Sequence, residues 1–276
     1  MSRPAAATGA DRAAGSGSGR GDRLRRTLLP LAVACGVLTL WQLGVFHRLL
    51  GLQPYTLAYP SEMLRALADN ADQLRSDVQI TMTEAGAGFL IGSSVGFGLA
   101  LLLSELPGMR RAVLPFVSGL AAMPVIALGP LMVLYFGFGI PSKAAVVVIM
   151  TLPPMTVATL KGLTSVDRDL QSLLESYAAG RRDVVRKLRL PYALPFVFTG
   201  LKINVTLSLI GAIIAEFFAS THGLGQQMHY ALRTFNMPVA WGAMFVAAAL
   251  GVLWYQLVNV IERRVIPWHS SIRGPA

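Results

Sequence analysis

A run of 20 uncharged residues decides the fold: residues 85–104 read AGAGFLIGSSVGFGLALLLS and lie between Glu84 and Glu105. An α-helix rises about 1.5 Å per residue, so about 20 residues cross the ~30 Å hydrocarbon core of a bilayer. Within the run, Gly88, Gly92 and Gly96 recur every four residues and form one bare stripe along such a helix. Because backbones approach closely over small residues, we expect a tightly packed inner transmembrane helix.

The rest of the chain repeats this pattern of apolar runs separated by short charged clusters. Of its 276 residues, 54% are hydrophobic and 14% are charged, whereas a soluble domain carries about 25% charge. The stretch 112–142 is too long for one straight helix, and Pro124, Pro130 and Pro141 mark where it would break. We predict an all-α, polytopic membrane protein whose six transmembrane helices lie at or within residues 27–46, 85–104, 112–142, 144–160, 196–219 and 234–261.

The distribution of positive charge predicts the orientation in the membrane. With the N-terminus in the cytoplasm, 19 of the 24 lysines and arginines fall in cytoplasmic segments, and the other 5 fall outside. Cytoplasmic loops carry such an excess in most membrane proteins. Both termini are therefore expected in the cytoplasm, and the net charge of +10 needs no nucleic acid as a partner.

These patterns divide the chain into four parts. Residues 1–26 are small and basic, which predicts a disordered cytoplasmic tail. Residues 27–80 hold the first transmembrane helix and a periplasmic amphipathic segment. The 20-residue apolar run in this part is long for a signal peptide, so we interpret it as uncleaved. Residues 81–262 form the transmembrane core with a cytoplasmic loop at 161–195, and residues 263–276 form a second cytoplasmic tail.

The loop at 161–195 is the most informative part outside the membrane. Leu170, Leu173, Leu174 and Tyr177 share one face of a helix, and a basic helical stretch follows before Leu190 and Pro191 end it. Two interpretations stay open. The loop lies on anionic lipid, or it forms two short helices that dock on another protein.

Residues 175–195, ESYAAGRRDVVRKLRLPYALP, resemble the EAA loop of permease subunits in binding-protein-dependent ABC importers. Upstream, residues 123–139, MPVIALGPLMVLYFGFG, resemble the nitrate/sulfonate/taurine permease group. Downstream, TGLK at 199–202, AE at 215–216 and GLG at 223–225 are similar to that group too. The resemblance implies a type I ABC importer permease (MetI-like) fold, with 81–262 as the permease core.

The loop departs from the family's pattern at two positions. Counting back from Leu190, the family's glycine falls on Ala178 and its leading glutamate falls on Ser172. Glu175 and Gly180 lie nearby but out of register. The resemblance therefore implies a degenerate ATPase-coupling loop, made of Ser172, Glu175, Tyr177, Ala178, Gly180, Arg181, Arg182, Leu190 and Pro191.

The family also implies partners. They are a separate ABC ATPase subunit, a second permease copy in a homodimer, and an extracytoplasmic solute-binding protein, all at a bacterial inner membrane. The residues supply an independent check, because a P-loop needs a lysine between glycine and serine or threonine. None of the four lysines has these neighbours. The chain should therefore bind no cofactor and be no enzyme, with ATP used by the partner.

Glu216 is an acidic residue within the fifth expected span, where a charge is costly. It is either a gate or solute-path residue, together with Asn204 and Ser208, or it makes a structural hydrogen bond near residues 223–225. A rival function is an ion-coupled secondary transporter with Glu216 as the carrier residue. His222 and His229 lack an evident third ligand, so no metal site is expected.

The solute stays open between two classes. It is a sulfonate-, nitrate- or taurine-like anion, or a vitamin precursor of the pyrimidine or riboflavin type. Residues 198–216, FTGLKINVTLSLIGAIIAE, resemble the pyrimidine/riboflavin branch slightly more.

Overall fold

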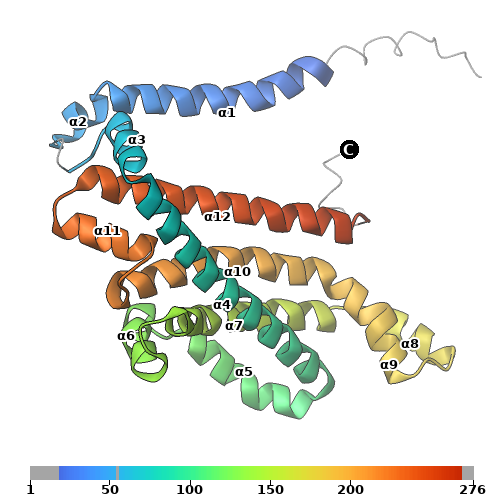
Figure 1. Cartoon of the computed structure of the whole chain (residues 1–276). Coiled ribbons are helices and arrows are strands. Elements are labelled where there is room, and N and C mark those ends of the chain that lie inside the picture. Colours follow the sequence, from blue (N-terminus) through green and yellow to red (C-terminus); the bar gives the residue numbers. More distant parts are fainter. Residues whose placement is uncertain (1–18, 54–55, 269–276) are drawn as a thin grey trace, which may run out of the picture. The chain divides into compact units, whose positions relative to one another are not determined.

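The computed structural model describes residues 19–53 and 56–268, which are helical and contain no strand. The chain divides into two compact units, Met1–Glu62 and Met63–Ala276. Most of the two predicted tails lies outside the described residues. The helices are α1 (Gly19–Gln42), α2 (Val45–Leu50), α3 (Pro60–Asp69), α4 (Ala71–Glu105), α5 (Pro107–Ala121), α6 (Val125–Phe136), α7 (Ile140–Thr164), α8 (Arg168–Ser176), α9 (Arg181–Val184), the π-helix η1 (Val185–Arg189), α10 (Leu190–Ala219), α11 (Leu224–Arg233) and α12 (Met237–Val265) (Figure 1).

The first unit contains the first predicted span, with different boundaries. Helix α1 begins at Gly19, within the predicted tail, and ends at Gln42 rather than Phe46. Gly44 has a φ of 71°, in the left-handed region that L-residues avoid, so it ends the helix and separates it from α2.

Polar contacts hold the chain after α2 against the end of α1. The Gln42 amide donates to the Ser61 hydroxyl at 2.9 Å and accepts from the Ser61 amide at 3.1 Å. His47 bonds the Leu57 carbonyl at 2.7 Å and stacks on Tyr59 at 4.4 Å. These contacts order the segment that leads into α3, the amphipathic helix expected from the sequence.

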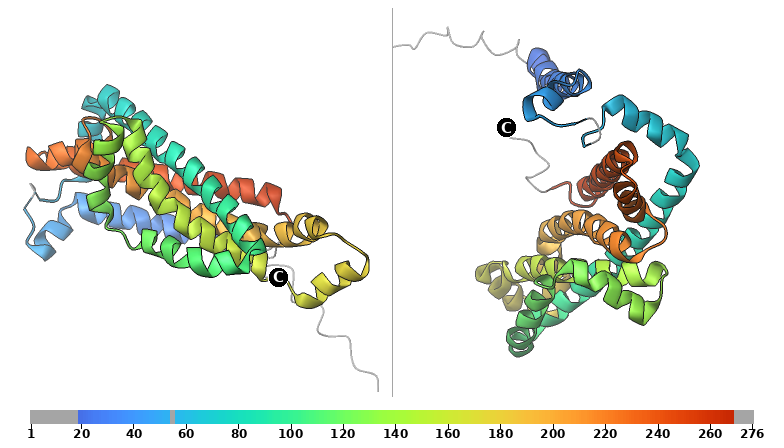
Figure 2. Two further views of the ribbon diagram at one scale, coloured as in Figure 1. Left: turned by 90° about the horizontal axis from the view of Figure 1, so that it is seen from below. Right: turned by 90° about the vertical axis from the view of Figure 1, so that its left-hand side faces the viewer.

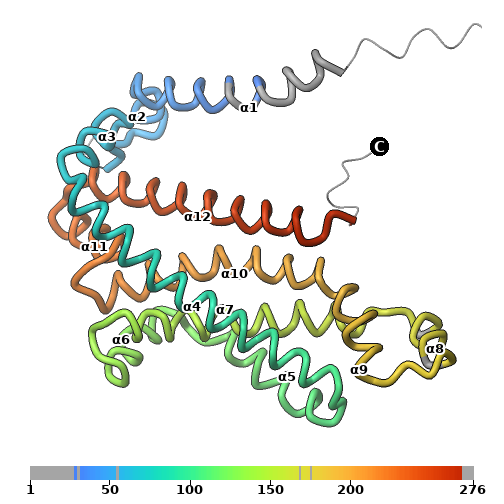
Figure 3. The backbone as a smooth tube through the Cα atoms, turned by 45° about the vertical axis from the view of Figure 1, so that its right-hand side comes forward, coloured from blue at the N-terminus to red at the C-terminus, as the bar shows by residue number. Residues whose placement is uncertain are grey.

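In the second unit, α4 crosses α7 and α10 obliquely, and the three helices form its centre (Figures 1 and 3). Helix α4 has 35 residues, about 52 Å at 1.5 Å per residue, and so exceeds the ~30 Å hydrocarbon core. The predicted span at 85–104 is therefore only part of this helix, and Glu84 lies within it rather than at its start.

The glycine stripe of α4 contacts α7, as the sequence predicted. A Cβ at Gly88 or Gly92 would overlap Val147 or Thr151, and one at Gly96 would lie 2.7 Å from the Leu152 carbonyl oxygen. Lipid tails are as apolar as the helix side chains, so transmembrane helices gain no hydrophobic stabilisation when they associate. Close van der Waals contact along the stripe stabilises the pair instead.

The third predicted span is broken, as its length required. Helices α5 and α6 meet at an angle of 99° across the short turn that contains Pro124 (Figure 3). Pro130 lies inside α6 without ending it, and Pro141 occupies the first turn of α7. Leu128 of α6 packs with Val146 and Ala215, which anchors the bent segment on α7 and α10.

Four described helices are long and apolar enough to cross a membrane, and the bent α5–α6 pair would make a fifth. They are α4, α7, the continuous helix Arg181–Ala219 and α12. The remaining predicted span is α1, whose described apolar part is Ala32–Gln42. The all-α, polytopic, multi-span architecture is thus confirmed, although the fifth span begins before residue 196.

The end of α12 lies within the fold. Ile266 is fully buried against Phe89, Phe198, Val205 and Val258, so the predicted tail from residue 263 begins inside a packed element. Lys202 of α10 forms an ion pair with Glu262 of α12. The ion pair neutralises two charged groups that lie between helices, where the bilayer would not solvate them.

We expect Gly96→Ala to lower the stability of the protein by about 1–3 kcal/mol, the usual cost of overpacking. The new Cβ would lie 2.7 Å from a backbone carbonyl oxygen and 2.9 Å from the Met155 Cβ. Gly98→Ala on the same helix is the matched control, because no atom lies within 4 Å of its Cβ position. SDS-induced unfolding of the purified protein measures both, and equal stabilities would contradict the packing role.

Candidate functional site

The predicted coupling segment lies at one end of the second unit, beyond the end of α7 (Figure 2). It contains two short helices, α8 and α9, as the docking interpretation expects. The prediction that Leu190 and Pro191 end the second helix is wrong, because α9 continues through η1 into α10. Proline has no N–H to donate. The helix widens into a π-turn immediately before Pro191, where the Leu190 amide donates to the Val185 carbonyl five residues back.

Helix α8 presents an apolar face without a partner among the described residues. Leu170, Leu173 and Tyr177 are 45%, 53% and 77% exposed. Ser172 is exposed beside them, and exposed Arg181 and Arg182 follow on α9. The side chain of Glu175 lies outside the described residues. A contiguous apolar face with a basic edge is typical of a docking surface.

The turn between α8 and α9 explains why a glycine would be expected at residue 178. Ala178 has a φ of 57°, and the Ala179 amide donates to the Leu174 carbonyl at 3.1 Å. This is the Schellman arrangement, in which glycine usually occupies the left-handed position. Gly180 has an ordinary φ of −67° and begins α9 instead. The backbone that favours glycine is therefore at Ala178, where the register had placed it.

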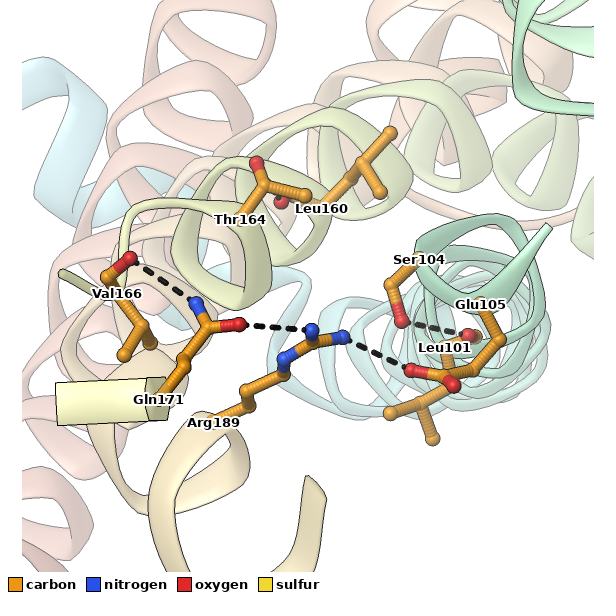
Figure 4. A network of polar contacts seen from close by, with 8 residues as sticks. All are labelled: Leu101, Ser104, Glu105, Leu160, Thr164, Val166, Gln171 and Arg189. Atoms are coloured by element: carbon orange, nitrogen blue, oxygen red, sulfur yellow. Dashed lines mark hydrogen bonds and ion pairs between the residues drawn. The ribbon is translucent and has the colours of Figure 1, made fainter. Parts of the chain in front are cut away.

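Arg189 joins this segment to the rest of the unit, and sequence reasoning had counted it only as one of the positive charges. Figure 4 shows its guanidinium between Gln171 of α8 and Glu105 at the end of α4. Both hydrogen bonds measure 3.0 Å. A cavity of about 330 Å³ adjoins it, lined in part by Ser104 and Arg181. No linear spacing reveals this contact, because 84 residues separate Arg189 from Glu105.

Glu216 lies in a buried polar cluster with both carboxylate oxygens bonded. It is 0% exposed and accepts from the Thr81 hydroxyl at 2.6 Å and from the Gly225 amide at 2.7 Å. The Leu224 amide in turn donates to the Thr81 hydroxyl at 2.9 Å, and the Gly223 amide donates to Asp77 at 2.9 Å. The cluster holds the turn between α10 and α11 against α4, as the structural interpretation of Glu216 expects.

Glu84 and Lys143 belong to the same cluster, which corrects their predicted places at the ends of spans. They are 2% and 1% exposed, and Glu84 interacts electrostatically with both Glu216 and Lys143. The ammonium also donates to the Gly139 carbonyl at 3.4 Å. The attraction between Glu84 and Lys143 offsets part of the cost of burying a carboxylate inside the protein.

Asn204 and Ser208 are also fully buried. The Asn204 amide donates to the Ser93 hydroxyl and to the Thr151 carbonyl, each at 2.9 Å, and so joins α10 to α4 and α7. Ser208 donates to its own helix at the Val205 carbonyl. Their predicted place on a solute path stays a prediction.

The two histidines show no metal-site geometry. The His229 ring stacks on Phe217 at 4.6 Å and bonds the Phe217 carbonyl at 2.6 Å. Within residues 19–53 and 56–268, no group of three His, Cys, Asp or Glu side chains could hold a metal ion.

Ala178→Gly should stabilise the end of α8 by about 1 kcal/mol, because an L-residue in the left-handed region is strained. Hydrogen exchange at the Ala179 amide would then slow by about fivefold. Ala179→Gly is the control: its φ is not positive, so glycine there brings no relief. Faster exchange in Ala178→Gly would contradict the assignment.

Glu216→Ala should lower the free energy of unfolding by about 3 kcal/mol, because two buried donors lose their acceptor. Glu216→Gln keeps an acceptor and should cost less than half as much. SDS-induced unfolding measures both variants. A stable Glu216→Ala protein that no longer transports would contradict the structural role and favour the solute-path interpretation.

Comparison with known proteins agrees with this geometry. Residues 88–267 match the family model described as binding-protein-dependent transport system inner membrane component. The formylaminopyrimidine transport permease protein ThiX of Halalkalibacterium halodurans is 31% identical over 250 residues, which cover 90% of this chain and 99% of the relative. The riboflavin transport system permease protein RibX of Chloroflexus aurantiacus is 28% identical, covering 85% of this chain and 88% of its own.

A solved structure supports the same fold. An inward-facing structure of the MetNI methionine ABC transporter aligns with a TM-score of 0.61 at 20% identity, covering 72% of this chain and 97% of the other. The family consists of transport components rather than enzymes, with the ATPase on a separate subunit. The chain therefore belongs to the binding-protein-dependent transport system inner membrane components, the permease subunits of ABC importers.

Proposed function

We propose that this permease works as a homodimer, docks its ATPase subunits on α8 and α9, and imports a small nitrogen heterocycle delivered by an extracytoplasmic binding protein. The exposed apolar face of α8 carries the docking proposal. Leu170, Leu173 and Tyr177 are exposed at the spacing of one helix face, and the exposed Arg181 and Arg182 follow on α9. Such a face suits a protein groove, since an amphipathic helix lays its apolar side into one.

The orientation proposal places α8, α9 and both chain ends in the cytoplasm. Lys143 is buried and bonds the Gly139 carbonyl, and Lys202 forms an ion pair with Glu262, so neither reports on a membrane side. Without them, 18 lysines and arginines lie in the segments assigned to the cytoplasm and 4 lie outside. The asymmetry supports an ATPase-facing role for the α8–α9 segment, because ATP is available on that side.

The solute proposal follows the relatives. ThiX and RibX carry names that assign them formylaminopyrimidine and riboflavin, and both match this chain over more than four fifths of its length. Both solutes are planar nitrogen heterocycles. A sulfonate, nitrate or taurine is the other class, and competition in the transport assay distinguishes the two.

We expect Leu173→Glu to abolish binding of the ATPase subunit and ATP-driven uptake of labelled formylaminopyrimidine. A carboxylate at a half-exposed position on the docking face would be desolvated on binding without a partner. Co-purification and uptake into proteoliposomes with the ATPase and binding protein measure the two effects.

Leu64→Glu is the matched control. Leu64 lies on α3 and is 69% exposed, so the substitution adds the same charge at another exposed leucine. It should keep both activities. Full uptake by Leu173→Glu would overturn the docking proposal, and competition by taurine rather than by pyrimidines would overturn the proposed solute class.

A further inference from the structure

Helix α8 is held to the rest of the second unit mainly by polar contacts. Its described side chains take no part in the buried apolar clusters of the described structure. Extensive packing joins α4, α7 and α10, and none of comparable extent joins α8 to another described helix. A displacement of α8 therefore reaches the transmembrane helices through the chain itself and through side-chain hydrogen bonds.

Arg189 provides the longest-range of these hydrogen bonds. One terminal nitrogen donates to Glu105 at the end of α4, and the other donates to Gln171 on α8. The Gln171 amide in turn donates to the carbonyl of Val166, a buried residue in the turn that follows α7 (Figure 4). One side chain thus joins α4, α8 and the helix that becomes α10.

The chemistry of arginine suits this role. Its planar guanidinium holds two acceptors at fixed directions, which a lysine ammonium on a flexible stem cannot do. The side chain is 25% exposed and Glu105 is 35% exposed, so water screens the ion pair only in part. By contrast, Lys187 on the same π-helix pairs with Asp183 four residues away, at 71% and 50% exposure, and joins no second element.

The backbone conformation at Arg189 is a second feature that distinguishes this residue from its neighbours. Arg189 ends η1, a π-turn within the otherwise continuous helix Arg181–Ala219. Such turns are rare and are frequent at functional sites. The side-chain tie to α4 therefore leaves the helix at the point where its backbone departs from α-helical geometry.

We infer that Arg189 is a positioning residue that transmits movement of the α8–α9 segment to α4 while the backbone transmits it to α10. This inference rests on the proposed function, since it needs an ATPase that moves the segment. Because α4 packs on α7 along its glycine stripe, a pull through Arg189 moves the pair together. Without the tie, ATP hydrolysis moves α10 but no longer α4.

The test is Arg189→Gln in the reconstituted complex of permease, ATPase and binding protein. We expect normal co-purification with the ATPase, because the exposed face of α8 is unchanged. Hydrolysis stimulated by loaded binding protein, and uptake per assembled complex, should each fall at least about fivefold, the lower end of typical coupling between sites. Lys187→Gln removes a positive charge from the same π-helix and should behave as wild type.

Two further variants separate transmission from folding. Glu105→Ala cuts only the arm to α4 at a partly exposed helix end, and should uncouple in the same way even where Arg189→Gln fails to assemble. The exchange Glu105→Arg with Arg189→Glu restores the ion pair, and the new carboxylate at residue 189 can accept from the Gln171 amide in place of the bond that Arg189 donates to it. It should recover part of the stimulated hydrolysis, which a loss of folded protein would not allow.

The outcomes are distinct. Wild-type levels of both stimulated hydrolysis and uptake per assembled complex in the Glu105→Ala and Arg189→Gln variants would overturn the inference while leaving the proposed function intact. A wild-type permease that neither bound the ATPase nor transported would instead overturn the proposed function.

Discussion

The backbones of α4 and α7 meet along Gly88, Gly92 and Gly96, and much of the second unit is arranged around this contact. In a bilayer, lipid tails are as apolar as leucine, so helices gain little by hiding apolar side chains from their surroundings. Close backbone approach is what remains, and it requires residues without a Cβ. Helix α10 completes the centre at Gly200 and Gly211, which approach Met155 and Met150 of α7.

The same lack of water determines where the polar groups lie. Glu216, Glu84 and Lys143 are all buried, and the two carboxylate oxygens of Glu216 accept from α4 and from the first turn of α11. A polar group without partners is expensive inside a membrane protein, so hydrogen bonds to Glu216 and the attraction between Glu84 and Lys143 offset part of the cost of burial. The cluster fixes the turn between α10 and α11. This turn follows the C-terminal end of α10, whereas the α8–α9 segment precedes the N-terminal end of α10.

The arrangement is reversed in the α8–α9 segment. Its apolar face is exposed, and polar contacts attach it to the rest of the unit. A docking element has to bind a partner with one face and report the partner's movement through the other. In the roles proposed above, the exposed Leu173 and Tyr177 bind the partner, and Arg189 with Gln171 reports its movement. The left-handed Ala178 between the two helices shows that this turn keeps its shape even without the expected glycine.

Hydrophobic run length, charge distribution and local motifs determined the membrane architecture, the glycine-lined helix, the break at Pro124, the two short helices α8 and α9, and the family. These properties follow from residues close together in the sequence, for which helix geometry fixes the outcome. Only the tertiary structure decided the bond of Glu216 to Thr81, the burial of Glu84 and Lys143, and the link from Arg189 to Glu105. The two hydrogen bonds join residues 135 and 84 positions apart. The local sequence does not distinguish a charged residue at the end of a transmembrane helix from one buried among the helices, because the difference depends on which helix packs beside it.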